Sequence, residues 1–164
     1  MKIGLISDSH NETKMLKYVA NMFECLGIDT VIHCGDVTDA KEINVLKRFK
    51  LYLAYGNSDL NYSSFAEKIT QFNNKSQSGR FLDLLINEKR IFVIHGDDRR
   101  KFIDAIQRKC YDYIFCGHSH KISDKKIGNT RIINPGALAG RYGSQSTFAV
   151  IDLETDKLER FYIE

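Results

Sequence analysis

Five short polar clusters contain the residue types best suited to chemistry, and they hold four of the five histidines in the chain. The clusters are Asp8-Ser9-His10, Gly35-Asp36, Gly56-Asn57-Ser58-Asp59, His95-Gly96-Asp97 and Gly117-His118-Ser119-His120. Imidazole and carboxylate groups are the usual nitrogen and oxygen ligands of divalent transition metals. In an extended chain, the i, i+2 spacing of His118 and His120 directs both side chains to one side. Asp8 and His10 repeat that spacing, so the clusters predict a metal site.

Each polar cluster directly follows an apolar segment that reads as a strand. The segments are KIGLIS, TVIHC, LYLAY, RIFVI and YIFC, at residues 2–7, 30–34, 51–55, 90–94 and 113–116. In open α/β sheets, ligands bind at the carboxyl ends of the strands. We therefore expect the five clusters to meet at one edge, although they lie far apart in the sequence.

The spacing of apolar residues predicts helices between these strands. Helices are expected over residues 11–26, 41–50, 65–72 and 99–109, and hairpins over residues 81–95 and 147–164. Asn11 is the expected N-cap of the first helix, and Gly27 its expected stop. The first half alternates strands and helices as parallel sheets do, and the second half adds antiparallel pairs. Two sheets packed face to face, with helices outside, would hold these strands in one domain, residues 1–164.

The composition excludes several functional classes. No apolar run approaches the roughly 20 residues that a membrane span needs, so no membrane association is expected. A net charge of +3, from 24 basic against 21 acidic residues, is too small to argue for nucleic acid. The N-terminus lacks the features of a signal peptide, and the four cysteines form no C-x-x-C pair. These features favour a reduced, cytoplasmic location.

The order and content of the clusters resemble the calcineurin-like metallophosphoesterase superfamily. The matching motifs are D-x-H at Asp8, G-D at Gly35, G-N at Gly56, H-G at His95 and G-H-x-H at Gly117. The segment NPGA, residues 134–137, is similar to the NPGS of the small prokaryotic phosphodiesterase subfamily. The resemblance implies an α/β fold, namely a four-layer α/β/β/α sandwich of two mixed β-sheets flanked by helices, with a two-metal site.

Carried over position by position, the resemblance assigns a residue of this chain to every ligand position of that site. One ion is implied to bind Asp8, His10, Asp36 and His120, and the other Asp36, Asn57, His95 and His118, so that Asp36 bridges them. The catalytic residues implied are Asp36, Asn57, His95 and His118. The cofactors implied are two divalent transition-metal ions, with manganese favoured and nickel, iron or zinc also compatible with mixed nitrogen and oxygen ligands.

The function implied is hydrolysis of a small phosphate ester, preferably a diester, by a hydroxide that bridges the two ions. Larger members have histidine where this chain has Ser58, and a serine hydroxyl is a poor proton donor at neutral pH. Esters with good leaving groups should therefore react faster. Two alternatives stay open, a non-catalytic protein-binding scaffold of the same fold and a nuclease, although a nucleic-acid partner is not favoured. Formation of a homo-oligomer is also left open by the sequence.

Other polar residues near the clusters have supporting roles. Asp59 and Asp97 are expected either to orient a ligand imidazole or to serve only as a turn cap or a surface charge. His33 lies inside a strand and is expected to be a buried, hydrogen-bonded histidine and not a ligand. Asn134 is expected to shape a loop near the site. The polar segment of residues 61–80 is a candidate for substrate selection or an oligomer contact.

Overall fold

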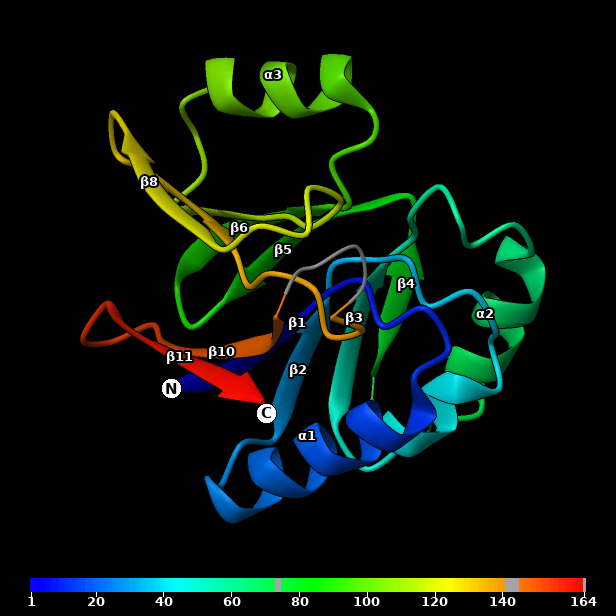
Figure 1. Cartoon of the computed structure of the whole chain (residues 1–164). Coiled ribbons are helices and arrows are strands. Elements are labelled where there is room, and N and C mark those ends of the chain that lie inside the picture. The colour runs from blue at the N-terminus through cyan, green and yellow to red at the C-terminus, as the bar shows by residue number, and fades with distance from the viewer. Residues whose placement is uncertain (73–74, 141–144, 164) are drawn as a thin grey trace.

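A computed structural model describes residues 1–72, 75–140 and 145–163, and two β-sheets form its centre (Figure 1). The strands of the larger sheet are β1 (Lys2–Ile6), β2 (Thr30–His33), β3 (Lys50–Ala54), β4 (Gln77–Gly79), β10 (Ser146–Asp152) and β11 (Lys157–Ile163). Their order across the sheet is β11-β10-β1-β2-β3-β4. Strands β1 to β4 run parallel, whereas β10 is antiparallel to both β1 and β11.

The smaller sheet follows in the second half of the chain. Its strands are β5 (Phe81–Ile86), β6 (Lys89–Ile94), β7 (Tyr113–Phe115), β8 (Ser123–Ile127) and β9 (Thr130–Asn134). They lie in the order β5-β6-β7-β9-β8, with β6, β7 and β9 parallel and the two edge strands antiparallel to their neighbours. Both sheets are therefore mixed, as predicted.

Helices cover the outer faces of the two sheets (Figure 1). They are α1 (Thr13–Cys25), the 3₁₀ helix η1 (Glu42–Leu46), α2 (Tyr62–Thr70) and α3 (Arg99–Gln107). The predicted stop of α1 at Gly27 is confirmed. Gly27 has a φ of 66°, and the amides of Gly27 and Ile28 donate to the carbonyls of Glu24 and Phe23. These two bonds satisfy carbonyl groups that the end of a helix leaves open. Among the described residues, no helix is long and apolar enough to span a membrane.

Three apolar clusters hold the layers together. In β1, Ile6 packs toward α1, whereas Ile3 and Leu5 pack between the sheets. This alternation follows the two-residue period of a strand, and it explains why β1 is apolar on both faces. The third cluster joins the smaller sheet to α3 and includes Phe92 and Ala105. The layers therefore follow the predicted order of helix, sheet, sheet and helix.

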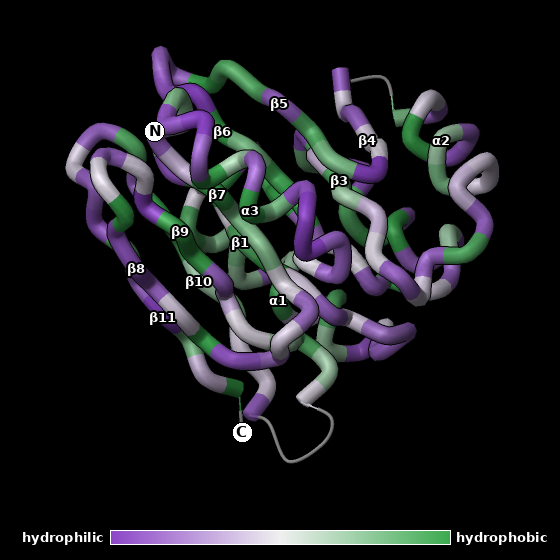
Figure 2. Tube along the Cα trace, turned by 90° about the horizontal axis from the view of Figure 1, so that it is seen from above, coloured by the Kyte–Doolittle hydropathy of each residue, from purple (hydrophilic) through white to green (hydrophobic). Residues whose placement is uncertain are grey.

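The structure differs from the predicted elements at four places. The helix predicted over residues 65–72 is α2, which begins at Tyr62, after the N-cap Asn61, and ends at Thr70. The helix predicted over residues 41–50 is only the short η1, because Lys50 already pairs with Thr30 in the larger sheet. The N-cap of α1 is Glu12, because Asn11 adopts a φ of 64°. Strands β4 and β8 were not predicted, because their sequences QSG and SDKKI carry no apolar alternation. Figure 2 shows the hydrophilic character of β8 beside its apolar neighbour β9.

Candidate metal centre

The polar clusters meet at the carboxyl ends of strands from both sheets, as predicted. Asp8 follows β1, Asp36 follows β2 and His95 follows β6, and one ligand atom from each lies within 4.8 Å of the others. A second group, formed by Asp8, His10 and His120, meets the same limit. Five of the seven predicted ligand residues therefore surround one place. The two groups share Asp8, whereas the resemblance implies that Asp36 is the shared ligand.

The backbone at the ligand residues is not extended, so the predicted reason for their common direction was wrong. Asp8 and His10 have φ values of 53° and 43°, and His118 and His120 have φ values of 65° and 57°. These values lie in the left-handed region, which residues other than glycine rarely adopt. Hydrogen bonds to the neighbouring loop hold this conformation, since the amides of Asp8 and His10 donate to the carbonyls of Gly35 and Asp36 at 2.9 Å. Strained backbone of this kind is concentrated at functional sites.

Asp8 is completely buried, and its two carboxylate oxygens have different surroundings. Oδ2 accepts hydrogen bonds from the Ser7 hydroxyl at 2.6 Å and from the His118 amide at 3.1 Å. Oδ1 has no hydrogen-bond partner, and it lies 3.2 Å from Nε2 of His120 and 4.0 Å from Nε2 of His95. Ser7 and the His118 amide thus direct the unused oxygen of Asp8 toward the imidazoles.

The proton of the His95 ring is placed by the backbone. Nδ1 lies 2.7 Å from the carbonyl oxygen of Cys34, which can only accept, so Nδ1 carries the hydrogen. In the neutral ring, Nε2 then presents a lone pair toward Asp36 Oδ1, which is 3.4 Å away. Nε2 itself is buried and has no hydrogen-bond partner. A buried lone pair facing carboxylates is unfavourable unless a cation lies between them. Neutral imidazole and carboxylate groups are suitable ligands for a divalent ion, so these residues fit such an ion.

The charges around His95 lead to the same conclusion. Burial, the largest effect, lowers the pKa of His95, but the nearby carboxylates of Asp36 and Asp8 outweigh it and raise the pKa. In the absence of another cation, these carboxylates favour a proton on the ring. A divalent ion would replace that proton, since ligand imidazoles must be neutral.

Asp36 is oriented by its neighbour in the third cluster. The backbone amide of Ser58 donates to Asp36 Oδ1 at 2.8 Å, and the Ser58 hydroxyl donates to Oδ2 at 3.0 Å. Burial raises the pKa of Asp36, but the nearby His95 ring and the hydrogen bonds from Ser58 outweigh it and hold the pKa well below its usual range. Oδ1 faces His95, whereas Oδ2 lies 3.8 Å from Nε2 of His10. The carboxylate therefore faces one imidazole with each oxygen.

Asn57 and His118, the remaining predicted ligands, are both exposed, and His118 lies outside the two groups. The ring of His118 packs edge-on against that of His95, with centroids 5.1 Å apart. The side chain of Asn57 is exposed beside Ser58. The ligand roles of these two residues stay predictions.

A comparison with known protein families identifies the chain. Residues 1–156 match the model of the calcineurin-like phosphoesterase superfamily domain. The chain belongs to the calcineurin-like phosphoesterase superfamily. Its metal-dependent phosphoester hydrolysis agrees with the Asp and His groups described above.

Individual members and solved structures agree with this assignment. A phosphodiesterase of Methanocaldococcus jannaschii is 27% identical over the full length of both chains. The solved structure of an archaeal phosphodiesterase has a TM-score of 0.94 and 25% identity, covering 99% of this chain and 100% of that one. A zinc complex of Vps29 from Entamoeba histolytica shares the fold, with a TM-score of 0.69 and 17% identity over 99% of both chains.

Asp59 and Asp97 of this phosphoesterase do not orient an imidazole. The Asp59 carboxylate accepts hydrogen bonds from the backbone amides of Asp36, Val37, Thr38 and Gly56. It thereby ties the second cluster to the third. Asp97 instead binds the guanidinium of Arg80. Of the two roles left open for Asp59, capping the loop is the one observed.

A buried hydrogen-bonded chain lies behind the loop between Asp8 and His10. His33 is the expected buried histidine, because its Nδ1 accepts from the Gly35 amide and its Nε2 contacts the Ser9 hydroxyl, both at 3.1 Å. Burial lowers the pKa of His33 to about 3, so the ring is neutral. The Ser9 hydroxyl in turn donates to Glu42 Oε2 at 3.3 Å. Burial raises the pKa of Glu42 to about 7. No sequence pattern points to Glu42, which lies within the helix predicted over residues 41–50.

Asn134 shapes the loop beneath the last cluster, as predicted. Its amide nitrogen donates to the Gly117 carbonyl at 2.7 Å, and its oxygen accepts from the Gly136 amide at 2.8 Å. Gly117 itself lies so close to the first cluster that an added Cβ would stand 1.8 Å from Ser7 Oγ and 2.8 Å from Asp8 Oδ2. Only glycine allows the two clusters to approach in this way.

Proposed function

We propose that this phosphoesterase is a phosphodiesterase that uses two divalent transition-metal ions. The proposed ligands of the first ion are Asp8, His10, Asp36 and His120, and those of the second are Asp36, Asn57, His95 and His118. The diester preference is supported by the phosphodiesterase of M. jannaschii, which is similar along its whole length.

One observation carries the metal proposal. Asp8 Oδ1 and His95 Nε2 are both buried, both lack a hydrogen-bond partner, and lie 4.0 Å apart. Each group has its other polar atom occupied, Asp8 by Ser7 and His95 by the Cys34 carbonyl. Buried polar groups are normally satisfied, so a pair of this kind indicates a cation-binding site.

The residues of the chain prepare the site for this chemistry. Divalent cations bound there would attract an anionic phosphate and make water more acidic. The hydrogen bonds from Ser58 and the nearby His95 ring hold the pKa of Asp36 well below its usual range, so its carboxylate is charged at neutral pH. The Cys34 carbonyl keeps the ligand nitrogen of His95 unprotonated in the neutral ring. Because the imidazoles must be neutral to bind, activity is expected to fall on acidification.

Metal-dependent hydrolysis of bis(4-nitrophenyl) phosphate tests this function. Protein freed of metal with a chelator should be inactive, and a divalent ion should restore release of nitrophenolate. Asp36→Asn should lose metal and activity together, by more than about 100-fold, since even residues that only orient metal ligands are worth 10- to 100-fold. Asp39→Asn is the matched control, because Asp39 is exposed and caps a turn through the Lys41 amide. Metal binding and activity retained by Asp36→Asn would contradict the proposal.

We propose manganese as the native ion and the cytoplasm as the location. Mixed nitrogen and oxygen ligands without thiolate suit manganese, and also nickel, iron or zinc. The four cysteines are free thiols, which suits a reducing compartment. Metal analysis of the protein as purified, without added metal, tests the choice of ion. A predominance of zinc, nickel or iron would contradict manganese.

The scaffold and nuclease alternatives rank below this proposal. The likeness to Vps29 is a likeness of fold, and the Asp and His groups of this chain are complete enough to bind metal. The net charge of +3 gives little attraction for a nucleic-acid backbone. Failure of every divalent ion to support hydrolysis would favour the scaffold.

A further inference from the structure

A pocket of about 350 Å³ opens beside the candidate metal centre, between α3 and the β8–β9 hairpin. Its walls are largely apolar and include Phe102, Ile106, Cys116, Ile127 and Ile132, and His118 borders it. Its volume is within the usual range for pockets that bind small organic molecules. The pocket thus adjoins the place where a phosphate would bind.

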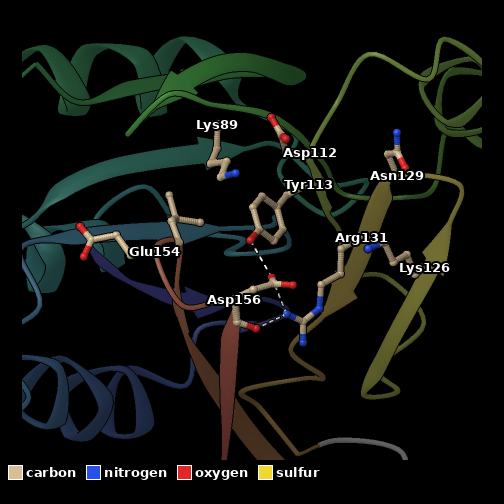
Figure 3. A pocket seen from close by; sticks show the side chains of 9 residues that line it. Lys89, Asp112, Tyr113, Lys126, Asn129, Arg131, Glu154 and Asp156 are labelled. Atoms are coloured by element: carbon tan, nitrogen blue, oxygen red, sulfur yellow. Dashed lines mark hydrogen bonds and ion pairs between the residues drawn. The ribbon is translucent and has the colours of Figure 1, made fainter.

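The pairing of β8 with β9 decides which side chains face this pocket. Ser123, Lys125 and Ile127 alternate along one face of β8, and Lys125 lies opposite Ile132 of β9. The intervening Lys126 faces the other side of the hairpin. There it lines a separate pocket of about 200 Å³ (Figure 3).

Three polar residues of that separate pocket bind one another. The Tyr113 hydroxyl donates to Asp156 Oδ1 at 2.7 Å, and Arg131 donates to the same oxygen at 2.6 Å (Figure 3). The lining of that pocket is mainly polar. The apolar pocket differs, because Lys125 is the one lysine, arginine or carboxylate residue among the described residues that line it. Burial raises the pKa of the Cys116 thiol to about 12, so Cys116 is a neutral part of the wall. The apolar pocket therefore suits an uncharged, mainly apolar group attached to an anion.

We propose that the apolar pocket binds one organic substituent of the phosphoester, and that this substituent is a mainly apolar ring such as an aryl group. The inference rests on the proposed function, because the phosphate must lie at the metal centre for its substituent to reach beyond His118. The substrate class is therefore a ring-bearing phosphoester in preference to an ester of a small alcohol.

Binding of two phosphonates to the zinc-loaded protein tests the pocket without catalysis. Phenylphosphonate and methylphosphonate share the anionic group, and neither is a phosphoester. In spectra of protein with ¹³C-labelled isoleucine methyl groups, phenylphosphonate should shift the signals of Ile106, Ile127 and Ile132. Methylphosphonate should leave these three signals in place while still binding. Ile43, in the cluster under α1, serves as the internal control.

Each alternative outcome has a distinct meaning. Binding of phenylphosphonate without shifts at the three pocket isoleucines would overturn the pocket and leave the phosphodiesterase proposal standing. Equal shifts with both compounds would also overturn the pocket. Binding of neither compound would overturn the phosphate site and, with it, this inference.

Inhibition constants for the same two phosphonates test the walls of the pocket. Phenylphosphonate should inhibit about tenfold more tightly than methylphosphonate, the effect of burying an apolar ring. Ser123→Phe, which fills the pocket, should remove this preference, and so should Ile127→Ser, which removes an apolar wall at a half-exposed position. Lys126→Phe, on the opposite face of the hairpin, is the matched control and should keep the preference for phenylphosphonate. A preference retained by both pocket variants would overturn the proposal.

Discussion

Among single residues, those that orient the proposed ligands shape the metal centre as much as the ligands do. Ser7 occupies one oxygen of Asp8, the Cys34 carbonyl occupies one nitrogen of His95, and Ser58 contacts both oxygens of Asp36. Each contact leaves a lone pair directed at the same place. Such partners of metal ligands fix their orientation and contribute to metal affinity.

Ser58→Ala tests whether this serine orients a ligand or supplies a proton. The Ser58 hydroxyl donates to Asp36 Oδ2, so its hydrogen is not directed at a leaving group. We expect Ser58→Ala to weaken metal affinity by about tenfold. The dependence of the rate on the pKa of the leaving group should stay unchanged, as measured with a series of substituted aryl diesters. A steeper dependence in Ser58→Ala would show that the hydroxyl is the proton donor.

Glu42 makes stability depend on pH. Its pKa, raised by burial from 4.5 to about 7, means that the folded state holds this proton more tightly than the unfolded state. The resulting stability is fully present below pH 4.5 and is lost as the pH rises through 7. The loss should amount to a few kcal/mol, since each pKa unit corresponds to about 1.4 kcal/mol.

Glu42→Gln should therefore flatten the dependence of the free energy of unfolding on pH between 5 and 8. Denaturant titrations of the metal-free protein at several pH values measure this. If the free energy of unfolding of Glu42→Gln declined equally steeply between pH 5 and 8, other groups would be responsible for the pH dependence.

Among the elements, strands were predictable and loops were not. The segments KIGLIS, TVIH and LYLA are apolar and β-rich, and they form β1, β2 and β3 close to their predicted bounds. The ligand loops contain left-handed residues such as Asp8 and His118, whose conformation is set by contacts with other loops. Local sequence patterns carry no such information. The polar strand β8 was missed for a related reason, because it depends on pairing with β9.

Gly117→Ala tests the close approach of two ligand loops. The added methyl group would overlap Ser7 Oγ and displace the side chain that orients Asp8. We expect a loss of about 2 kcal/mol in stability, as for other overpacked sites, together with weaker metal binding. Gly128→Ala, in the β8–β9 turn with open space around it, is the control. It should lose about 1 kcal/mol for its positive φ and retain metal affinity. Equal metal affinity in both variants would contradict the role of this contact.

For the whole molecule, the sandwich joins parts of the chain that no local pattern connects. The proposed ligand residues come from the ends of β1 and β2 in one sheet and of β6 in the other, and His120 follows β7. The rule that ligands bind at the carboxyl ends of strands predicted the edge. The resemblance supplied the number of ions and the division of ligands between them, because neither follows from spacing alone.

Removal of metal should lower the stability of the whole molecule. An ion that binds only the folded state at 100 times its Kd adds about 2.7 kcal/mol. For a chain of this size, that corresponds to a Tm roughly 5–10 °C higher. Thermal unfolding with manganese and with excess chelator measures this difference in Tm. In Asp36→Asn, the difference in Tm between the two conditions should be small. An identical Tm in both conditions would contradict a structural contribution from bound metal.

Anomalous diffraction from a crystal grown with manganese tests the central claim most directly. We predict two anomalous peaks, one among Asp8, His10 and His120 and the other beside Asp36 and His95. A structure in which these side chains keep their positions with no anomalous peak between them would contradict the account.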